Sequence, residues 1–282
     1  MTLSPRETAL AVLLCMTGCP PVAHVSQLVV YAPPPPPRPL GPPAPLRVIH
    51  ASPDPTVAHV VLTVDGRIAA QDIPFGGAAG YGEVPAGHHT IQLHPRQLPP
   101  TTPPPLSEEL QLMGPHASTL IVHGLLVGTP NIAFVQADDT TSTPAAGHGR
   151  LRFFHAAVGL GVVEICIATR GAHRPGFPLF AGGDEGAFLV AETALVDASP
   201  QWADVEVAEA VTLQLREQNV DDPCHGTELG TATIVVPDQA RVTLVAIGRL
   251  DGDPAVAPAI LVCPDGPLPD ARCDSVPIGT GR

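Results

Sequence analysis

The stretch HASPD, residues 50–54, places an imidazole, a hydroxyl and a carboxylate close together. These are the groups of an acid–base–nucleophile triad, in which the histidine must contact both partners. On an extended strand and the turn after it, His50, Ser52 and Asp54 occupy alternate positions and cannot meet in that way. We therefore expect a structural role, in which His50 ends a strand and Ser52 or Asp54 bonds backbone amides in the next turn.

The same opening recurs later in the chain without the hydroxyl and the carboxylate. LRVIHASPD, residues 46–54, and LRFFHAAVG, residues 151–159, share Leu-Arg and His-Ala at matching positions. Arg152 and His155 thus correspond to Arg47 and His50, but Ser and Asp are missing beside His155. His155 is present without the serine and aspartate that a triad would need, which favours a structural role for both His50 and His155.

Twelve histidines raise the question of a metal site, most of all in GHHTIQLH, residues 87–94. In a strand, His88 and His89 face opposite sides, whereas His88 and His94 share a side but lie about 20 Å apart, too far for one ion. No H-E-x-x-H or H-x-H spacing occurs. We therefore expect surface or edge histidines here, and neither a metal nor another cofactor.

An enzyme would need histidines from loops of both halves to converge beside a carboxylate in a pocket. The histidines that could do so are His50, His59, His123, His155, His173 and His225.

Acidic and aromatic side chains offer no better ligand site. The acidic pairs lack the spacing of a calcium loop, so we expect solvated turn charges at Asp138-Asp139, Asp221-Asp222 and Asp251-x-Asp253. Trp202 is the sole tryptophan, and one such ring is too few for a carbohydrate-binding face of stacked aromatic side chains. We expect Trp202 to be buried in a core beneath a strand. The phenylalanines of the second half are expected to fill its core, namely Phe153, Phe154, Phe177, Phe180 and Phe188.

The N-terminus predicts export. MTLSPRETALAVLLCMTGC, residues 1–19, has one arginine before a short apolar run and then small residues before Cys19. This ending resembles the bacterial lipoprotein signal, which implies cleavage after residue 18 and lipidation of Cys19. The expected location is the cell envelope, at the outer membrane or cell surface through a lipid anchor. A secreted or periplasmic protein is the alternative.

Cysteine usage agrees with an oxidising compartment. Four cysteines remain after Cys15 and Cys19 are set aside, and all fall in the second half: Cys166, Cys224, Cys263 and Cys273. No C-x-x-C spacing favours a metal, so we expect two disulfides, in any of three connectivities. Each would stabilise the fold by roughly 2–4 kcal/mol.

Composition excludes several functions. The formal net charge is −13 and the chain contains no lysine. A nucleic-acid partner would need a broad positive face, and a Schiff base or a Walker-type phosphate loop would need a lysine. The 36 prolines and 27 glycines favour short strands and turns over long helices.

Turn signals and internal repeats predict two β-sandwiches in tandem. Strand-like runs alternate with turns such as PD, DG, FGG and PAG every eight to twelve residues, which is typical of a sandwich. TIQL recurs as TLQL and TLIVHGLL as TLVAIGRL, in the same order as the LRxxHA copies. We expect a signal peptide at 1–18, a proline-rich spacer at 19–45, a first sandwich at 46–138, a linker at 139–149, a second sandwich at 150–265 and a tail at 266–282.

The first copy resembles the bacterial envelope module known as domain of unknown function 4397. The motifs that carry the resemblance are Arg47 to Asp54, Val64-Asp65-Gly66, Ile73 to Gly76, Tyr81, Val84 to Gly87 and Thr90-Ile91. The second copy keeps Arg152, His155 and Ala156 but has Ala-Val-Gly in place of Ser-Pro-Asp. The resemblance implies an immunoglobulin-like sandwich, secreted or surface-tethered, and supplies no catalytic residues.

The expected function is that of a non-enzymatic envelope lipoprotein, structural or adhesive. It would contact the membrane through its lipid and an envelope protein or glycan through its loops and sheet edges. The alternatives are a periplasmic small-ligand carrier, which needs an apolar cavity within a sandwich, and a histidine-based hydrolase or metal-dependent enzyme.

Overall fold

The computed structural model describes residues 41–97, 103–167, 179–183, 185–188, 190–191, 202–206, 210–250, 253–265 and 272–279. These residues form nineteen strands and two short 3₁₀ turns, η1 (Pro55–Val57) and η2 (Pro254–Val256). Within them, no helix is long and apolar enough to cross a bilayer. The all-β class expected from the turn spacing is confirmed.

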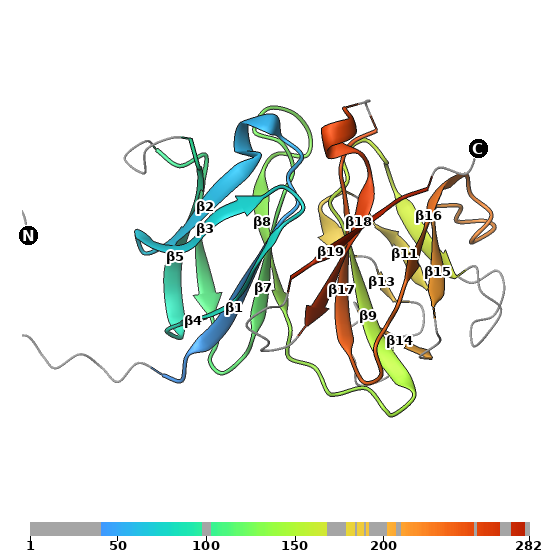
Figure 1. Ribbon diagram of the computed structural model, residues 1–282, viewed down its shortest axis with the longest axis horizontal. Helices are drawn as coiled ribbons and strands as arrows, with labels where there is room; N and C mark the ends of the chain where they lie inside the picture. The colour runs from blue at the N-terminus through green and yellow to red at the C-terminus, as the bar shows by residue number, and fades with distance from the viewer. Residues whose placement is uncertain are drawn as a thin grey trace, which may run out of the picture. The chain divides into compact units, whose positions relative to one another are not determined.

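The first sandwich packs two four-stranded sheets (Figure 1). The inner sheet has the order β4 (Ala78–Val84), β1 (Ala44–His50), β7 (Ser118–His123) and β8 (Ala133–Asp138). The outer sheet has the order β3 (Arg67–Pro74), β2 (His59–Val64), β5 (Gly87–Pro95) and β6 (Leu106–Leu112). Alternate residues such as Leu62, Ile91 and Leu93 fill the core between them.

The second sandwich repeats this strand order. Its inner sheet has the order β12 (Ala187–Phe188), β9 (His148–His155), β17 (Arg241–Ile247), β18 (Ala259–Asp265) and β19 (Asp274–Pro277), and β14 (Ala203–Glu206) also pairs with β9. Its outer sheet has the order β13 (Val190–Ala191), β11 (Phe180–Gly183), β10 (Val163–Ile167), β15 (Val211–Glu217) and β16 (Glu228–Ile234). The repeated TIQL and TLQL lie on the corresponding strands β5 and β15. The segment predicted as a C-terminal tail contains a further strand of the inner sheet, β19, because its backbone pairs with β18.

The two inner sheets share a third apolar cluster. Residues 39–282 group as one compact unit, and Figure 1 shows β1 and β7 on the side that faces β17 and β18. Ile49 and Ile121 from the first sandwich pack with Phe154, Val245 and Leu261 from the second. Phe154 thus belongs to this shared layer, while Phe153 and Phe180 lie in the second core as expected. Phe177 lies outside the described residues, as do the signal peptide and nearly all of the spacer.

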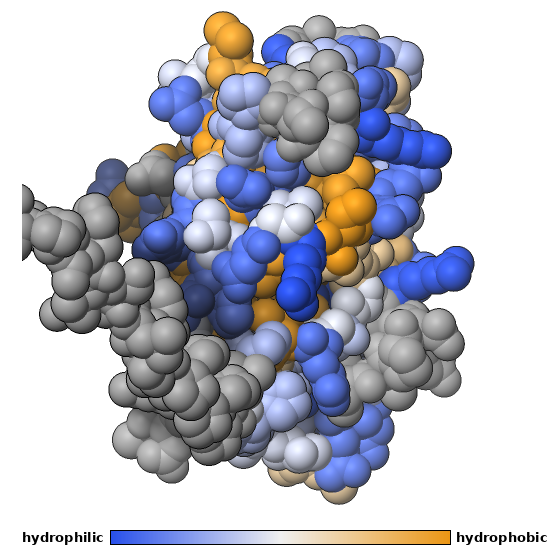
Figure 2. Space-filling view, turned by 90° about the vertical axis from the view of Figure 1, so that its left-hand side faces the viewer, coloured by the Kyte–Doolittle hydropathy of each residue, from blue (hydrophilic) through white to orange (hydrophobic). Residues whose placement is uncertain are grey.

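The opposite face of the first sandwich is open to solvent. Figure 2 shows hydrophilic side chains over much of this side, with apolar groups between them. Strand β3 is exposed along most of its length, and Ile68 on it is 53% exposed. The large buried apolar surface thus lies inside each sandwich and between the two.

Candidate functional site

The repeated arginine of the LRxxHA motif points away from its own core and into the layer between the sandwiches. In strand β1, Leu46 and Val48 pack inward, so Arg47 faces the other sandwich. The parallel register places Arg47 beside Thr119 of β7 and Arg152 beside Thr243 of β17. Both arginine side chains are fully buried.

Each arginine is held by its own sandwich and paired with the carboxylate of the other. The Nε of Arg47 donates to Thr119 at 3.0 Å, and its Nη2 donates to Asp265. The Nε of Arg152 donates to Thr243 at 2.8 Å, and its Nη2 donates to Asp139. The two halves thus exchange ion pairs in a pseudo-twofold arrangement.

The threonines and aromatic rings complete this network. Thr119 donates to Asp139 at 2.7 Å and Thr243 donates to Asp265 at 2.8 Å, so each sandwich orients its own carboxylate for the other's arginine. The Arg47 guanidinium lies 5.0 Å from the centre of the Tyr81 ring, and that of Arg152 lies 4.6 Å from the centre of the Trp202 ring.

The charges of this network shift two pKa values. Burial opposes the charge on Arg47, but Asp265, Tyr81 and Asp139 together outweigh it, and the pKa of Arg47 is raised. Burial also raises the pKa of Tyr81, whose hydroxyl donates to Asp139 at 2.7 Å. Both groups therefore stay protonated at neutral pH.

One sequence-based expectation is corrected in this layer. Asp139 was expected to be a solvated turn charge, but it is 3% exposed because the other sandwich covers it. Trp202 is buried as expected, and its ring stacks on the Arg152 guanidinium. Asp221 and Asp222 are exposed as expected, and Asp253 is exposed while its side chain accepts from the Ala255 amide of η2.

The HASPD side chains hold a turn and do not contact one another as a triad. The Nε2 of buried His50 lies 2.6 Å from the Val57 carbonyl, so it carries the proton and donates. Ser52 donates to the Gly124 carbonyl at 2.6 Å. Asp54 accepts from the amides of Thr56 at 2.8 Å and Leu126 at 2.9 Å. The structural role predicted for this motif agrees with these contacts.

Burial decides the protonation of His50. Its side chain is inaccessible to solvent, and desolvation lowers its pKa to about 4. In the second copy, the Nε2 of His155 faces the Gly161 carbonyl at 2.9 Å. The missing aspartate is replaced there by Glu185, which accepts from the amides of Gly159 at 2.6 Å and Gly161 at 3.3 Å.

The histidines proposed for an enzyme lie in separate settings. His59 contacts Asp72, His225 contacts Asp222, and His123 packs its ring edge-on against Phe154. Among the described residues, the one group of His, Cys, Asp and Glu with ligand atoms close enough for an ion contains no histidine; it consists of Glu164, Cys166 and Cys224. His173 lies outside the described residues.

The histidines of GHHTIQLH are not all at the surface. His88 is exposed, but His89 and His94 are 9% and 6% exposed. The expectation of surface or edge positions is wrong for these two, because β5 lies between β2 and β6. The ring nitrogens of His89 face Asp65 and the Pro85 carbonyl, each at 2.7 Å.

Two disulfides form from the four predicted cysteines. One joins Cys166 on β10 to Cys224 in the loop between β15 and β16. The other joins Cys263 on β18 to Cys273 just before β19. The first ties a loop onto the outer sheet and the second ties the last strand to its neighbour. Cys19 lies outside the described residues.

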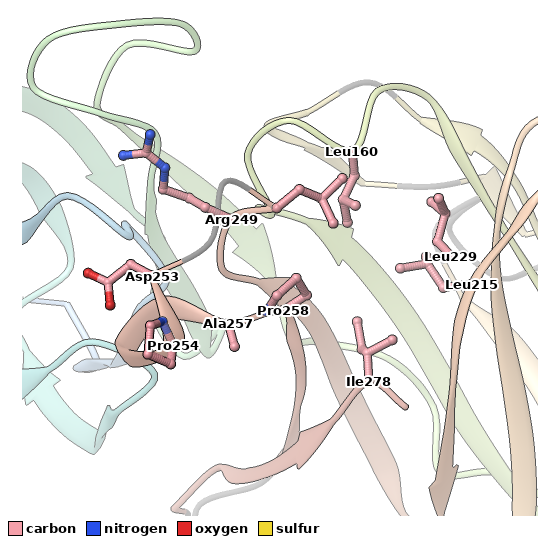
Figure 3. Close-up of a pocket in the computed structure, with 10 residues that line it drawn as sticks. Leu160, Leu215, Leu229, Arg249, Asp253, Pro254, Ala257, Pro258 and Ile278 are labelled. Carbon is pink, nitrogen blue, oxygen red and sulfur yellow. The ribbon is translucent and has the colours of Figure 1, made fainter. Parts of the chain in front are cut away.

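An apolar cleft of about 230 Å³ opens at one end of the second sandwich. Its walls come from both sheets and their connections, and Figure 3 shows Leu160, Leu215, Leu229 and Ile278 around it, with the side chains of Arg249 and Asp253 directed away from the leucines. An apolar lining with polar groups kept to the rim is what small apolar ligands require.

Comparison with known proteins finds a family model that matches part of the chain. Residues 44–166 match the family model described as Domain of unknown function (DUF4397). This segment spans the first sandwich and continues through β9 and most of β10 of the second. The DUF4397 resemblance of the first copy is therefore confirmed. A search of curated proteins finds no match.

Two solved structures are distantly similar. One is described as alpha-glucan binding by a streptococcal virulence factor; it is 8% identical, with 72% of this chain and 93% of that chain covered, at a TM-score of 0.22. The other is described as a proposed cell adhesion protein of Bacteroides fragilis; it is 9% identical, with 79% and 98% covered, at a TM-score of 0.20. At these scores, neither likeness bears on function.

Proposed function

We propose that this protein is a non-enzymatic, lipid-anchored envelope protein in which two DUF4397 sandwiches act as one rigid binding module. The observation that carries the proposal is the reciprocal exchange of buried Arg–Asp pairs between the sandwiches. Domains joined only by a linker normally move against each other unless their interface is large and apolar. Here an apolar cluster and two buried ion pairs join them, so loops of both sandwiches keep fixed relative positions.

The second half is proposed as a second family copy on three grounds. It keeps the LRxxHA residues, repeats the strand order of both sheets, and places Arg152, Thr243 and Asp265 as the counterparts of Arg47, Thr119 and Asp139. A shared ancestor explains these correspondences better than a chance match of short apolar motifs.

The anchor can be tested directly on the native protein. Intact mass spectrometry is expected to show loss of residues 1–18, acyl chains on Cys19 and two oxidised cysteine pairs. Cys19→Ala is expected to move the protein from the membrane fraction to the soluble fraction without changing its circular dichroism. An unprocessed chain of full mass, or an unmodified Cys19, would refute the anchor.

A small-ligand carrier is the second candidate function, and the apolar cleft is what favours it. Leu250 lines this cleft and is 55% exposed, so Leu250→Asp should disturb binding more than folding. An uncharged apolar fluorophore such as N-phenylnaphthylamine is expected to brighten with the wild-type chain and not with the variant. Val220→Asp, at a position 79% exposed and outside the lining, is the matched control. Equal brightening in all three proteins would exclude this cleft as a ligand site.

A further inference from the structure

A buried carboxylate lies beneath the disulfide on the outer sheet of the second sandwich. Glu164 and Cys166 are two residues apart on β10 and so share the face onto which the loop after β15 folds. Glu164 is 2% exposed, and its Oε1 accepts from the amide of Cys224 at 2.8 Å. A carboxylate oxygen of Glu164 and the two sulfurs lie within 4.8 Å of one another.

No cation balances this carboxylate among the ion pairs of the described residues. Arg216 lies directly opposite Glu164 in the strand register, yet it pairs with Glu228 at 3.1 Å and donates to the Gly226 carbonyl at 2.8 Å. A buried carboxylate that lacks a cation is costly. Glu164 therefore has no ion pair to give up before its carboxylate binds a metal ion, and the two sulfurs beside it supply further ligands once they are thiolates.

We propose that, when the Cys166–Cys224 bridge is reduced, Cys166, Cys224 and Glu164 bind one zinc-type divalent ion. A dithiol reductant transfers two electrons and two protons to the S–S bond and becomes a disulfide itself. The ion then displaces the two thiol protons, which leave to solvent. The site carries one net negative charge before and after this exchange, because the ion brings two positive charges and two protons leave.

The geometry fits zinc better than a hard cation. Ligand atoms at about 2.0–2.3 Å from a tetrahedral ion lie roughly 3.3–3.8 Å apart. The two sulfurs, bonded at 1.97 Å in the disulfide, would have to separate by about 2 Å after reduction, while the Glu164 oxygen already lies within 4.8 Å of both. Two thiolates select zinc over magnesium or calcium. Cys224 is half-buried in a loop of mostly exposed residues, so we expect its sulfur to be able to move away from Cys166 once the bridge is reduced.

Cobalt(II) titration of the full chain tests the proposal, since thiolate–cobalt bonds give a charge-transfer absorption band. After reduction by a phosphine and its removal without air, wild type is expected to bind one Co²⁺ that Zn²⁺ displaces. The oxidised chain is expected to bind none. Glu164→Gln is expected to weaken binding at least roughly tenfold, by analogy with the loss of supporting groups at metal sites.

The second disulfide provides the matched control. The double variant Cys263→Ser/Cys273→Ser is expected to retain the band after reduction, and Cys166→Ser/Cys224→Ser is expected to lose it. The proposal is refuted if the reduced chain shows no thiolate–cobalt absorption band, or if Glu164→Gln binds Co²⁺ as tightly as wild type. It is also refuted if the band is lost in Cys263→Ser/Cys273→Ser and kept in Cys166→Ser/Cys224→Ser. Loss of the folded circular dichroism spectrum on reduction also refutes it, because the ligands must be held by the fold.

Discussion

Replacement of Arg47 by methionine tests whether the buried ion pairs hold the two sandwiches together. Methionine keeps much of the side-chain length but removes the guanidinium that contacts Thr119, Asp265 and the Pro264 carbonyl. Asp265 then remains buried, with the hydroxyl of Thr243 and with Arg152 at 3.7 Å. The variant therefore isolates the loss of one cation from a buried pair.

The expected cost follows from burial. Both side chains of the Arg47–Asp265 pair are inaccessible to solvent, and removal of one partner from such a pair typically costs about 3–5 kcal/mol. For a unit of this size, each kcal/mol lowers the melting temperature by roughly 2–4 °C, so a fall of about 6–20 °C is expected.

Trp202 makes the measurement specific. As the only tryptophan, stacked 4.6 Å from the Arg152 guanidinium, it reports on the same layer through its fluorescence. Urea unfolding followed by this signal and by circular dichroism should give the same loss of stability for Arg47→Met.

Arg96→Met is the matched control. Its partner is Asp72, and the two side chains are 56% and 44% exposed, so about 0–1 kcal/mol is expected. If Arg47→Met costs no more than Arg96→Met, the buried pairs do not secure the interface and the rigid-module argument fails.

Three further results are expected. The pKa of His50 is about 4 in the folded state and near 6.5 in the unfolded state, so the unfolded state binds more protons between these pH values. The contribution of His50 to stability is therefore greatest above pH 6.5 and falls by up to about 3 kcal/mol as the pH drops to 4. The difference between the urea midpoints at pH 7.5 and pH 4.5 should be smaller for His50→Gln than for wild type, and an unchanged difference would contradict the assignment. Asp54→Ala leaves two turn amides without their acceptor and should cost about 1–2 kcal/mol in urea unfolding, whereas an effect near zero would mean that water replaces the carboxylate. Gly186→Ala should lower the melting temperature, because its φ is +85° and a Cβ would lie 2.5 Å from His123, and a neutral result would show that this turn can relax.

The sequence alone predicted the all-β class and the structural use of the HASPD residues, because both depend on local properties. Alternation of apolar residues and turn signals act over a few positions, and the spacing of His50, Ser52 and Asp54 excluded a triad before any fold was known. The repeated LRxxHA motif marked Arg47 and Arg152 as equivalent, and the cysteine count indicated two disulfides without their pairing.

Only the tertiary structure decided what the arginines bind and which polar groups are buried. Arg47 meets Asp265 across 218 positions of sequence, a contact set by how two sheets face each other and not by any local pattern. Contacts between distant segments also bury Asp139 in this layer, His89 in the outer sheet of the first sandwich and Glu164 beneath the loop after β15. The sequence left all three as polar residues with no evident partner. Burial of a charge depends on which surface covers it, and that is fixed only when distant strands come together.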